Sequence, residues 1–229
     1  MQKLRVGFLV DDLLPSHQVN ELIKFVDENQ CFDNPVLITG YKEARQESRF
    51  RKIISKFKKK PVSFFNIVLK AILLRVISRV ELKAAKKRYP GYSSNQKIKN
   101  VDDYKVVCVN GQWSRSGLFL EMTDEDISQI GACNLDCVIR CGSGILRGRI
   151  LDVAKFGVIS FHHGDNRTNR GGPSGFWEVL NGEPSSGFII QKLNQELDGG
   201  EVLFRGNLKT TDLWLPNYAQ LLAKSNTFS

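Results

Sequence analysis

Two adjacent histidines, His162 and His163, stand directly after a short apolar run, and the chain contains only three histidines in all. Histidine is the side chain that most readily takes up and releases a proton near neutral pH. The preceding residues 158–161 are rich in β-branched and aromatic side chains, which predicts a buried strand. Because open α/β sheets bind ligands beyond the carboxyl ends of their strands, this pair is a candidate for proton transfer.

The loop after the histidines is suited to an anion. Its arginines stand among asparagine, aspartate and glycine residues, and a guanidinium fork matches phosphate or carboxylate oxygens. We therefore predict contacts to an anionic substrate from Asn166, Arg167, Arg170 and Gly171. His163 is either a second proton carrier or a further contact to that substrate.

Ser160 lies two residues before His162, so both side chains face the same side of the predicted strand. The pair does not indicate a serine hydrolase, because the sharp Gly-x-Ser-x-Gly turn of a nucleophile elbow is absent. Asp198, in Leu-Asp-Gly-Gly, is either a turn residue or a carboxylate partner for a histidine.

Between about residues 103 and 206, an ordered set of short motifs resembles the formyltransferase catalytic domain, shared by glycinamide ribonucleotide, methionyl-tRNA and nucleotide-sugar formyltransferases. That family has a strand ending in Asn-x-His, an Arg-Gly loop, a Trp, Asn-Gly-Glu, a Thr-Gly strand start and Leu-Asp-x-Gly. This chain reads Ser160-Phe161-His162, Arg170-Gly171, Trp177, Asn181-Gly182-Glu183, Ser186-Gly187 and Leu197-Asp198-Gly199-Gly200. Each motif is weak alone, and their order makes the resemblance specific.

The resemblance implies transfer of a formyl group from 10-formyltetrahydrofolate to a primary amine, with His162 as the base and Asp198 as its partner. Ser160 stands where the family has an Asn whose amide stabilises the oxyanion. A hydroxyl is a single donor, and loss of one oxyanion donor typically costs about 10²–10³ in rate. Either a neighbour such as Asn166 or His163 compensates, or the chemistry is altered or lost.

Residues 135–151 resemble the strand and turn that line the family's folate pocket. By that resemblance the predicted folate contacts are Cys141, Gly142, Ser143, Gly144, Ile145, Leu146 and Leu197. The implied acceptor is an amino sugar on a nucleotide, whose phosphates suit the net charge of +9. Two alternatives stay open: an altered or inactive binding protein with this fold, and a 10-formyltetrahydrofolate hydrolase.

The elements that must position these residues alternate along the chain. The patterns predict strands over 6–10, 35–39, 105–110, 135–139, 158–161, 186–192 and 201–206. They predict helices over 18–29, 124–130, 145–153, 177–181 and 212–225, with residues 111–113 in a loop. This alternation predicts an α/β fold with a doubly wound, mostly parallel sheet, Rossmann-like as in the formyltransferases. The length of 229 residues suits a single catalytic domain, 1–229, with an insertion at about 42–100.

The insertion is strongly basic and departs most from the family. Basic clusters over 45–60 and 83–88 flank an apolar run that Lys70, Arg75 and Arg79 interrupt, so a bilayer span is not expected. The pattern predicts a basic amphipathic helix with three open roles. Residues 45–88 contact an anionic membrane surface, or they bind a nucleic acid or partner, or they pack as a lid or a homodimer interface. We expect no nucleic-acid partner.

The cysteines indicate reduced thiols. There are five of them and no secretory signal is visible, which favours a cytoplasmic protein, peripheral at the membrane if the basic helix binds there. Cys133, Cys137 and Cys141 recur every four residues, and the predicted strand turns all three to one face. They lack the spacing of a zinc site, so we expect no metal.

Overall fold

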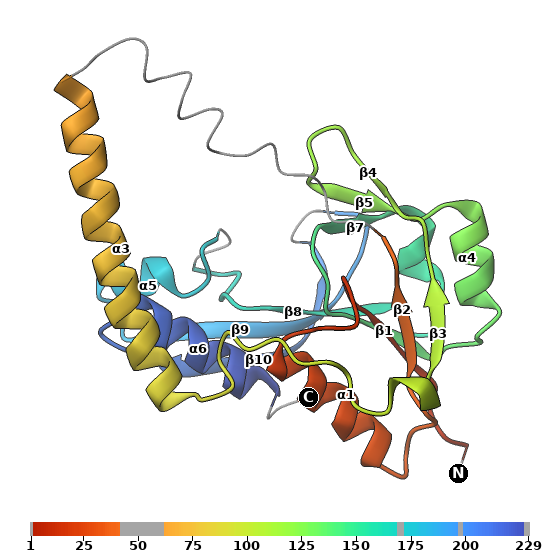
Figure 1. Ribbon diagram of the computed structural model, residues 1–229. Coiled ribbons are helices and arrows are strands. Elements are labelled where there is room, and N and C mark those ends of the chain that lie inside the picture. Colours follow the sequence, from red (N-terminus) through yellow and green to blue (C-terminus); the bar gives the residue numbers. More distant parts are fainter. Residues whose placement is uncertain (1, 42–61, 169–171, 197–198, 227–229) are drawn as a thin grey trace.

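The computed structural model describes residues 2–41, 62–168, 172–196 and 199–226 and, in the helix α3 (Val62–Arg88), the side chains from residue 72 onward. Within these residues seven strands form one sheet in the order β10-β9-β8-β6-β1-β2-β3 (Figure 1). The strands are β1 (Val6–Leu9), β2 (Val36–Thr39), β3 (Lys105–Cys108), β6 (Cys137–Arg140), β8 (Val158–His162), β9 (Ser185–Lys192) and β10 (Glu201–Lys209). The strands β8, β6, β1, β2 and β3 pair in parallel, and β9 pairs antiparallel with both β8 and β10. The predicted α/β fold with a mostly parallel sheet is confirmed.

Helices cover both faces of the sheet. On one face lies α1 (His17–Glu28), which Ser16 caps and which buries Leu22, Ile23 and Val26 against β1 and β2. On the other lie α4 (Asp124–Gly131) and the 3₁₀ helix η2 (Gly148–Asp152). Thr123 caps α4, in a reciprocal capping box with Asp126. A second 3₁₀ turn, η1 (Val101–Asp103), leads into β3.

The pairing register aligns side chains across the strand ends. Arg140 of β6 is opposite Ser160 of β8, which is opposite Gln191 of β9. Because side chains alternate along a strand, Ser160 and His162 face the same side as Val158, which packs in the core beneath α4. Phe161 and His163 face the opposite side, toward α1. The two adjacent histidines are therefore separated by the sheet.

Two predicted segments differ in the structure. The loop expected over 111–113 contains β4 (Gln112–Trp113), which pairs with β5 (Phe119–Glu121). The helix expected over 145–153 is instead β7 (Ile145–Arg147) followed by η2. Gly148 adopts a positive φ of 77° between them, which interrupts a helix, and β7 finds a partner in β5.

The three cysteines do not share a face, contrary to the prediction. The strand begins at Cys137 rather than at residue 135, so Cys133 lies before it and is buried in the core beneath α4. Cys137 and Cys141 pack on the opposite core, beneath α1. Each of these cysteines packs as a small apolar side chain, Cys133 in one core and the other two in the opposite core.

Helix α6 (Trp214–Ser225) connects the sheet to the long helix α3. The C-terminal part of α3 packs on α6 through Leu82 and Ala85, and the Glu81 carboxylate accepts a hydrogen bond from the Leu215 backbone N–H at 2.9 Å. That carboxylate stabilises the N-terminus of α6, where the helix dipole is positive. The short helix α5 (Phe176–Asn181) lies beside α6 and ends at Gly182, as predicted.

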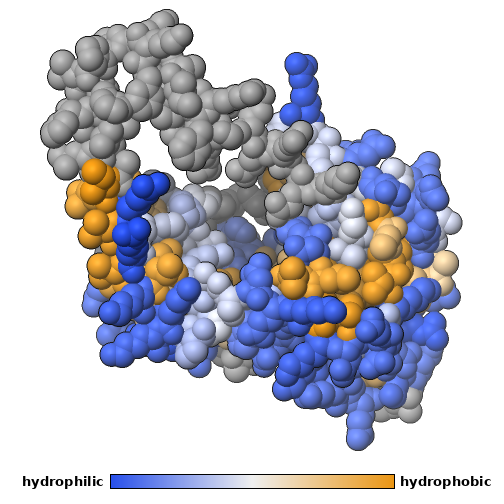
Figure 2. Space-filling view, viewed as in Figure 1, coloured by the Kyte–Doolittle hydropathy of each residue, from blue (hydrophilic) through white to orange (hydrophobic). Residues whose placement is uncertain are grey.

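The remainder of α3 projects away from the sheet (Figure 1). Every side chain from residue 72 to 80 is exposed, and Figure 2 shows apolar surface on this part of the molecule, at the left. The large apolar side chains in this stretch are Ile72, Leu73, Leu74, Val76, Ile77 and Val80. At about 100° per residue these six positions cover one broad side of the helix, and Arg75, Ser78 and Arg79 lie on the other. This part of α3 therefore has an apolar side and a polar side, both of them exposed. Of the helices the structure describes, none has the length and apolarity needed to cross a bilayer.

Candidate functional site

A cavity of about 170 Å³ lies at the carboxyl end of β8, and we call it the His162 cavity. It brings together five of the residues predicted for catalysis or folate contact, namely His162, Ser160, Gly144, Ile145 and Leu146. The remaining lining comes from β6, β8, β9 and the loop after β9, namely Arg140, Phe161, Gln191, Leu193, Asn194 and Glu196. The cavity therefore has apolar walls with polar groups at the strand ends.

His162 is half-buried in this cavity. Its ring makes no side-chain hydrogen bond to any residue that the structure describes. Asp198, predicted as its carboxylate partner, and Leu197, predicted to contact folate, lie outside the described residues. The imidazole thus lines the cavity with its ring nitrogens uncommitted to described neighbours.

Arg140 places a guanidinium in the same cavity. Its Nη1 donates to the Ser160 hydroxyl at 3.3 Å, and its Nη2 donates to the Gly144 carbonyl. The third nitrogen, Nε, is buried without a hydrogen-bond partner among the described residues. Burial lowers the pKa of Arg140 from its ordinary value, opposed by the nearby Tyr41 and Asp11, and a guanidinium stays charged under such a shift.

A second cavity, of about 280 Å³, lies on the other side of the sheet between α1 and α6, and we call it the His163 cavity. His163, Cys141 and Gly142 line it. The His163 ring stacks on Phe161, meets Tyr218 edge-on, and shares a hydrogen bond of 3.1 Å with the Ser225 hydroxyl. Burial among these groups lowers the pKa of His163 to about 4. His163 is therefore a neutral imidazole near pH 7.

The turn after β6 is held mainly by the protein's own side chains. Asp11 accepts hydrogen bonds from the Ser143 backbone N–H at 2.7 Å, the Ser143 hydroxyl at 2.6 Å and the Tyr41 hydroxyl at 2.8 Å. A Cβ at Gly142 would overlap the Tyr41 hydroxyl, and one at Gly144 would overlap the Trp113 ring. These two glycines make room for protein side chains. The predicted folate contacts are consequently divided between the two cavities and this turn.

The predicted anion loop forms its own ion pairs. Asp165 accepts hydrogen bonds from Arg167 at 2.7 Å and from Arg205 at 2.6 Å, and Arg205 also donates to the Asn166 side chain at 3.0 Å. The hydrogen bonds from Arg167 lower the pKa of Asp165. An anionic substrate would have to compete with Asp165 for Arg167. Arg170 and Gly171 lie outside the described residues.

Sequence reasoning missed the four other polar lining residues of the His162 cavity, namely Arg140, Gln191, Asn194 and Glu196. Arg140 carried one usable signal, since it is a cation at the end of an otherwise apolar strand. Gln191 carried none, because only the register of β9 against β8 brings it opposite Ser160.

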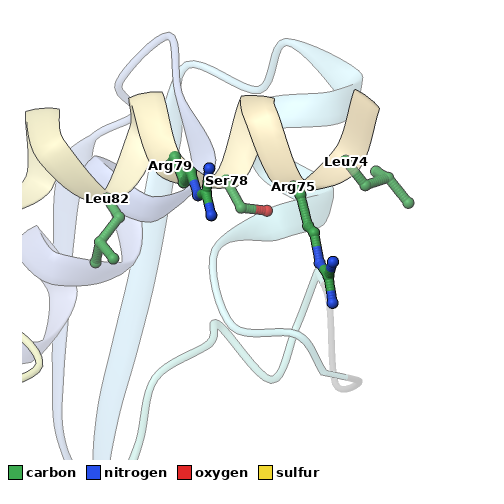
Figure 3. A pocket seen from close by; sticks show the side chains of 5 residues that line it. All are labelled: Leu74, Arg75, Ser78, Arg79 and Leu82. Carbon is green, nitrogen blue, oxygen red and sulfur yellow. The ribbon is translucent and has the colours of Figure 1, made fainter. Parts of the chain in front are cut away.

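A larger depression, of about 410 Å³, lies on α3 and is lined by Leu74, Arg75, Ser78, Arg79 and Leu82. Figure 3 shows that these side chains come from one side of a single helix. The depression contains neither a histidine nor a carboxylate. It therefore lacks the acid–base groups that the His162 cavity provides.

No family model matches the chain. In sequence it is 27% identical over 112 residues to a methionyl-tRNA formyltransferase from Ureaplasma parvum, covering 45% of this chain and 36% of that protein. It is 29% identical over 91 residues to a methionyl-tRNA formyltransferase from Bacillus pumilus, covering 39% of this chain and 29% of that protein. The alignments thus span about a third of the length of these curated relatives.

In structure the whole chain matches solved formyl-group enzymes. A phosphoribosylglycinamide formyltransferase from Anaplasma phagocytophilum matches with a TM-score of 0.58 at 15% identity, covering 99% of this chain and 82% of that chain. A formyltetrahydrofolate deformylase from Pseudomonas syringae matches with a TM-score of 0.56 at 14% identity, covering 99% and 58%. At these identities the matches establish the fold. The chain therefore has the fold of these formyl-group enzymes, and part of it is similar in sequence to methionyl-tRNA formyltransferases.

Proposed function

We propose that this protein transfers a formyl group from 10-formyltetrahydrofolate to a primary amine. The observation that carries the proposal is the shared cavity of His162, Ser160 and the Ile145–Arg147 strand, at the carboxyl end of β8. Sequence relatives named as methionyl-tRNA formyltransferases and a fold match to a phosphoribosylglycinamide formyltransferase support it.

The cavity suits the reacting end of a folate. Its volume of about 170 Å³ is below the roughly 300–1,000 Å³ of a pocket for a whole drug-sized ligand. It can therefore enclose a ring and a formyl group while the rest of the folate lies outside. Ile145, Leu146 and Leu193 offer apolar walls, and Gln191 and Asn194 offer amides for ring nitrogens and oxygens.

When bound, 10-formyltetrahydrofolate supplies a formyl carbon that an amine can attack. His162 then accepts the proton that the attacking amine loses, since it lines the cavity and its ring has no described hydrogen-bond partner. Asp198 orients that imidazole, as carboxylates do for catalytic histidines. The apolar walls limit the water that competes with the amine.

The acceptor we propose is an amino sugar on a nucleotide, a small and phosphate-bearing amine. The net charge of +9 favours an anion, and the anion loop with Asn166, Arg167, Arg170 and Gly171 is the expected contact. His163, which is neutral near pH 7, contributes a hydrogen bond rather than a charge.

Hydrolysis of 10-formyltetrahydrofolate is the second candidate, and the fold match to a formyltetrahydrofolate deformylase favours it. The same residues serve if water replaces the amine as the attacking group. The two functions differ in their product: hydrolysis releases formate, and transfer retains the formyl group on the acceptor.

For the projecting part of α3 we propose peripheral contact of a cytoplasmic protein with an anionic membrane. Its exposed apolar side chains are followed by Lys83, Lys86, Lys87 and Arg88, the pairing that interfacial helices use. The wild-type protein should sediment with vesicles that contain phosphatidylserine. The double variant Leu74→Glu/Val80→Glu should remain in the supernatant. Self-association without lipid, abolished by the same substitutions, would indicate a homodimer interface instead.

The folate site is tested by isothermal titration of 5-formyltetrahydrofolate, a stable analogue of the donor. We expect micromolar binding to wild type and to His162→Ala, because the cavity walls remain in that variant. Ile145→Glu should weaken binding at least tenfold, since it places a charged carboxylate in the apolar wall against which the folate ring must lie. Absence of binding to the folded wild-type protein would refute both folate-dependent functions.

A further inference from the structure

Arg140 carries a positive charge that the described protein does not balance by an ion pair. The other arginines near the candidate site, Arg167 and Arg205, are paired with Asp165. Arg140 forms no ion pair with a described carboxylate, and its Nε is buried without a described hydrogen-bond partner. An unpaired, partly buried charge is unfavourable. A ligand that brings negative charge into the cavity would remove this cost.

The surroundings of Arg140 indicate where such a charge would lie. Arg140 and Ser160 are directly opposite each other in the sheet, and Nη1 donates to the Ser160 hydroxyl at 3.3 Å. His162 lies two residues further along β8, on the same side of the sheet and in the same cavity. Guanidinium, hydroxyl and imidazole thus converge from two neighbouring strands.

We propose that Arg140 is a catalytic residue that binds the anionic oxygen formed during formyl transfer, together with the Ser160 hydroxyl. This inference rests on the proposed function. It explains how the reaction proceeds without the Asn amide that Ser160 replaces. A hydrogen bond from a charged guanidinium to an anion is about twice as strong as one between neutral groups.

The proposed reaction is an amide exchange. The amine lone pair forms a new N–C bond to the formyl carbon, and the carbonyl electron pair moves onto its oxygen, which Arg140 and Ser160 hold. The electron pair on the oxygen re-forms the carbonyl bond as the bond from that carbon to N10 of the folate breaks. His162 takes the proton from the amine and returns it to N10, which leaves with the electron pair of the broken bond.

The anion site can be tested without turnover. Formate carries the same small, anionic oxygen, and its binding broadens the NMR signal of ¹³C-labelled formate. We expect broadening by wild type that Arg140→Met removes. The matched control is Arg149→Met, because Arg149 is exposed and pairs with Asp124 at the surface. Equal broadening by all three proteins would overturn the assignment of an anion site to Arg140.

The catalytic role is tested by the rate of tetrahydrofolate formation from 10-formyltetrahydrofolate, with water and with aminated nucleotide sugars as acceptors. Arg140→Met and Arg140→Lys should lower the rate by about 10²–10³, the usual effect of losing an oxyanion donor. Binding of 5-formyltetrahydrofolate should stay within a few-fold of wild type. Adding Ser160→Asn to Arg140→Met should recover at least tenfold, because the amide returns a donor to the oxyanion.

The outcomes separate this inference from the proposed function. An active wild type with equally active, folded Arg140 variants would overturn the role of Arg140 and leave formyl transfer standing. A wild type that binds formate through Arg140 but neither binds folate nor forms tetrahydrofolate would refute formyl transfer, and with it the catalytic role. If Arg140→Met does not fold, Arg140→Gln removes the charge but keeps a polar side chain, and it carries both tests.

Discussion

Replacing His162 by glutamine is expected to lower the rate of formyl transfer by about 10²–10⁴, the usual contribution of a general base. Glutamine retains a polar side chain of similar length but cannot accept the proton from the attacking amine. Because His162 makes no described side-chain hydrogen bond, the fold should not depend on it. The loss should therefore fall on kcat, with 5-formyltetrahydrofolate affinity within a few-fold of wild type.

His17→Gln is the matched control, since His17 is the remaining histidine and does not line either cavity. That variant should keep the wild-type rate. The pH profile adds a second readout: if His162 is the base, the acidic limb of the kcat profile should disappear in His162→Gln. A variant that keeps both the rate and the acidic limb would remove His162 from the mechanism.

The neighbouring His163 is expected to govern stability in acid rather than catalysis. Its pKa is about 4 in the folded protein, against 6.5 as the ordinary value for the unfolded chain. Between these values the unfolded chain binds a proton that the folded protein excludes, so the free energy of unfolding falls as the pH falls from about 6.5 to 4. With about 1.4 kcal/mol for each pH unit, the loss between pH 7 and 4.5 is on the order of 2–3 kcal/mol.

Urea unfolding at several pH values measures this dependence. His163→Gln should lose most of the difference in stability between pH 7 and 4.5, because glutamine cannot take up the proton and can still pair with the Ser225 hydroxyl. His17→Gln provides the control, because His17 lines neither cavity, and a change that both variants share cannot be assigned to His163. If the free energy of unfolding changes with pH equally in His163→Gln and wild type, His163 is not the group that destabilises the folded state in acid.

Local patterns were sufficient to predict most of the sheet. The strands β1, β2, β8 and β9 and the helices α1 and α4 lie within a few residues of their predicted ranges, because each carries a clear hydrophobic period and a recognisable start or end. The predictions were wrong where pairing with another segment determines the secondary structure. Residues 145–147 have no strong period, and their pairing with β5 makes them a strand.

The candidate site divides in the same way. Alternation along one strand is enough to predict that His162 and Ser160 share one side of a strand end. Strand pairing in the folded sheet is needed to bring Arg140 and Gln191 beside them and to place His163 across the sheet in a cavity of its own. Those relations depend on the order and register of strands distant in sequence, which no local pattern encodes. The ring packing of Phe161 and Tyr218 around His163 is likewise a product of that arrangement.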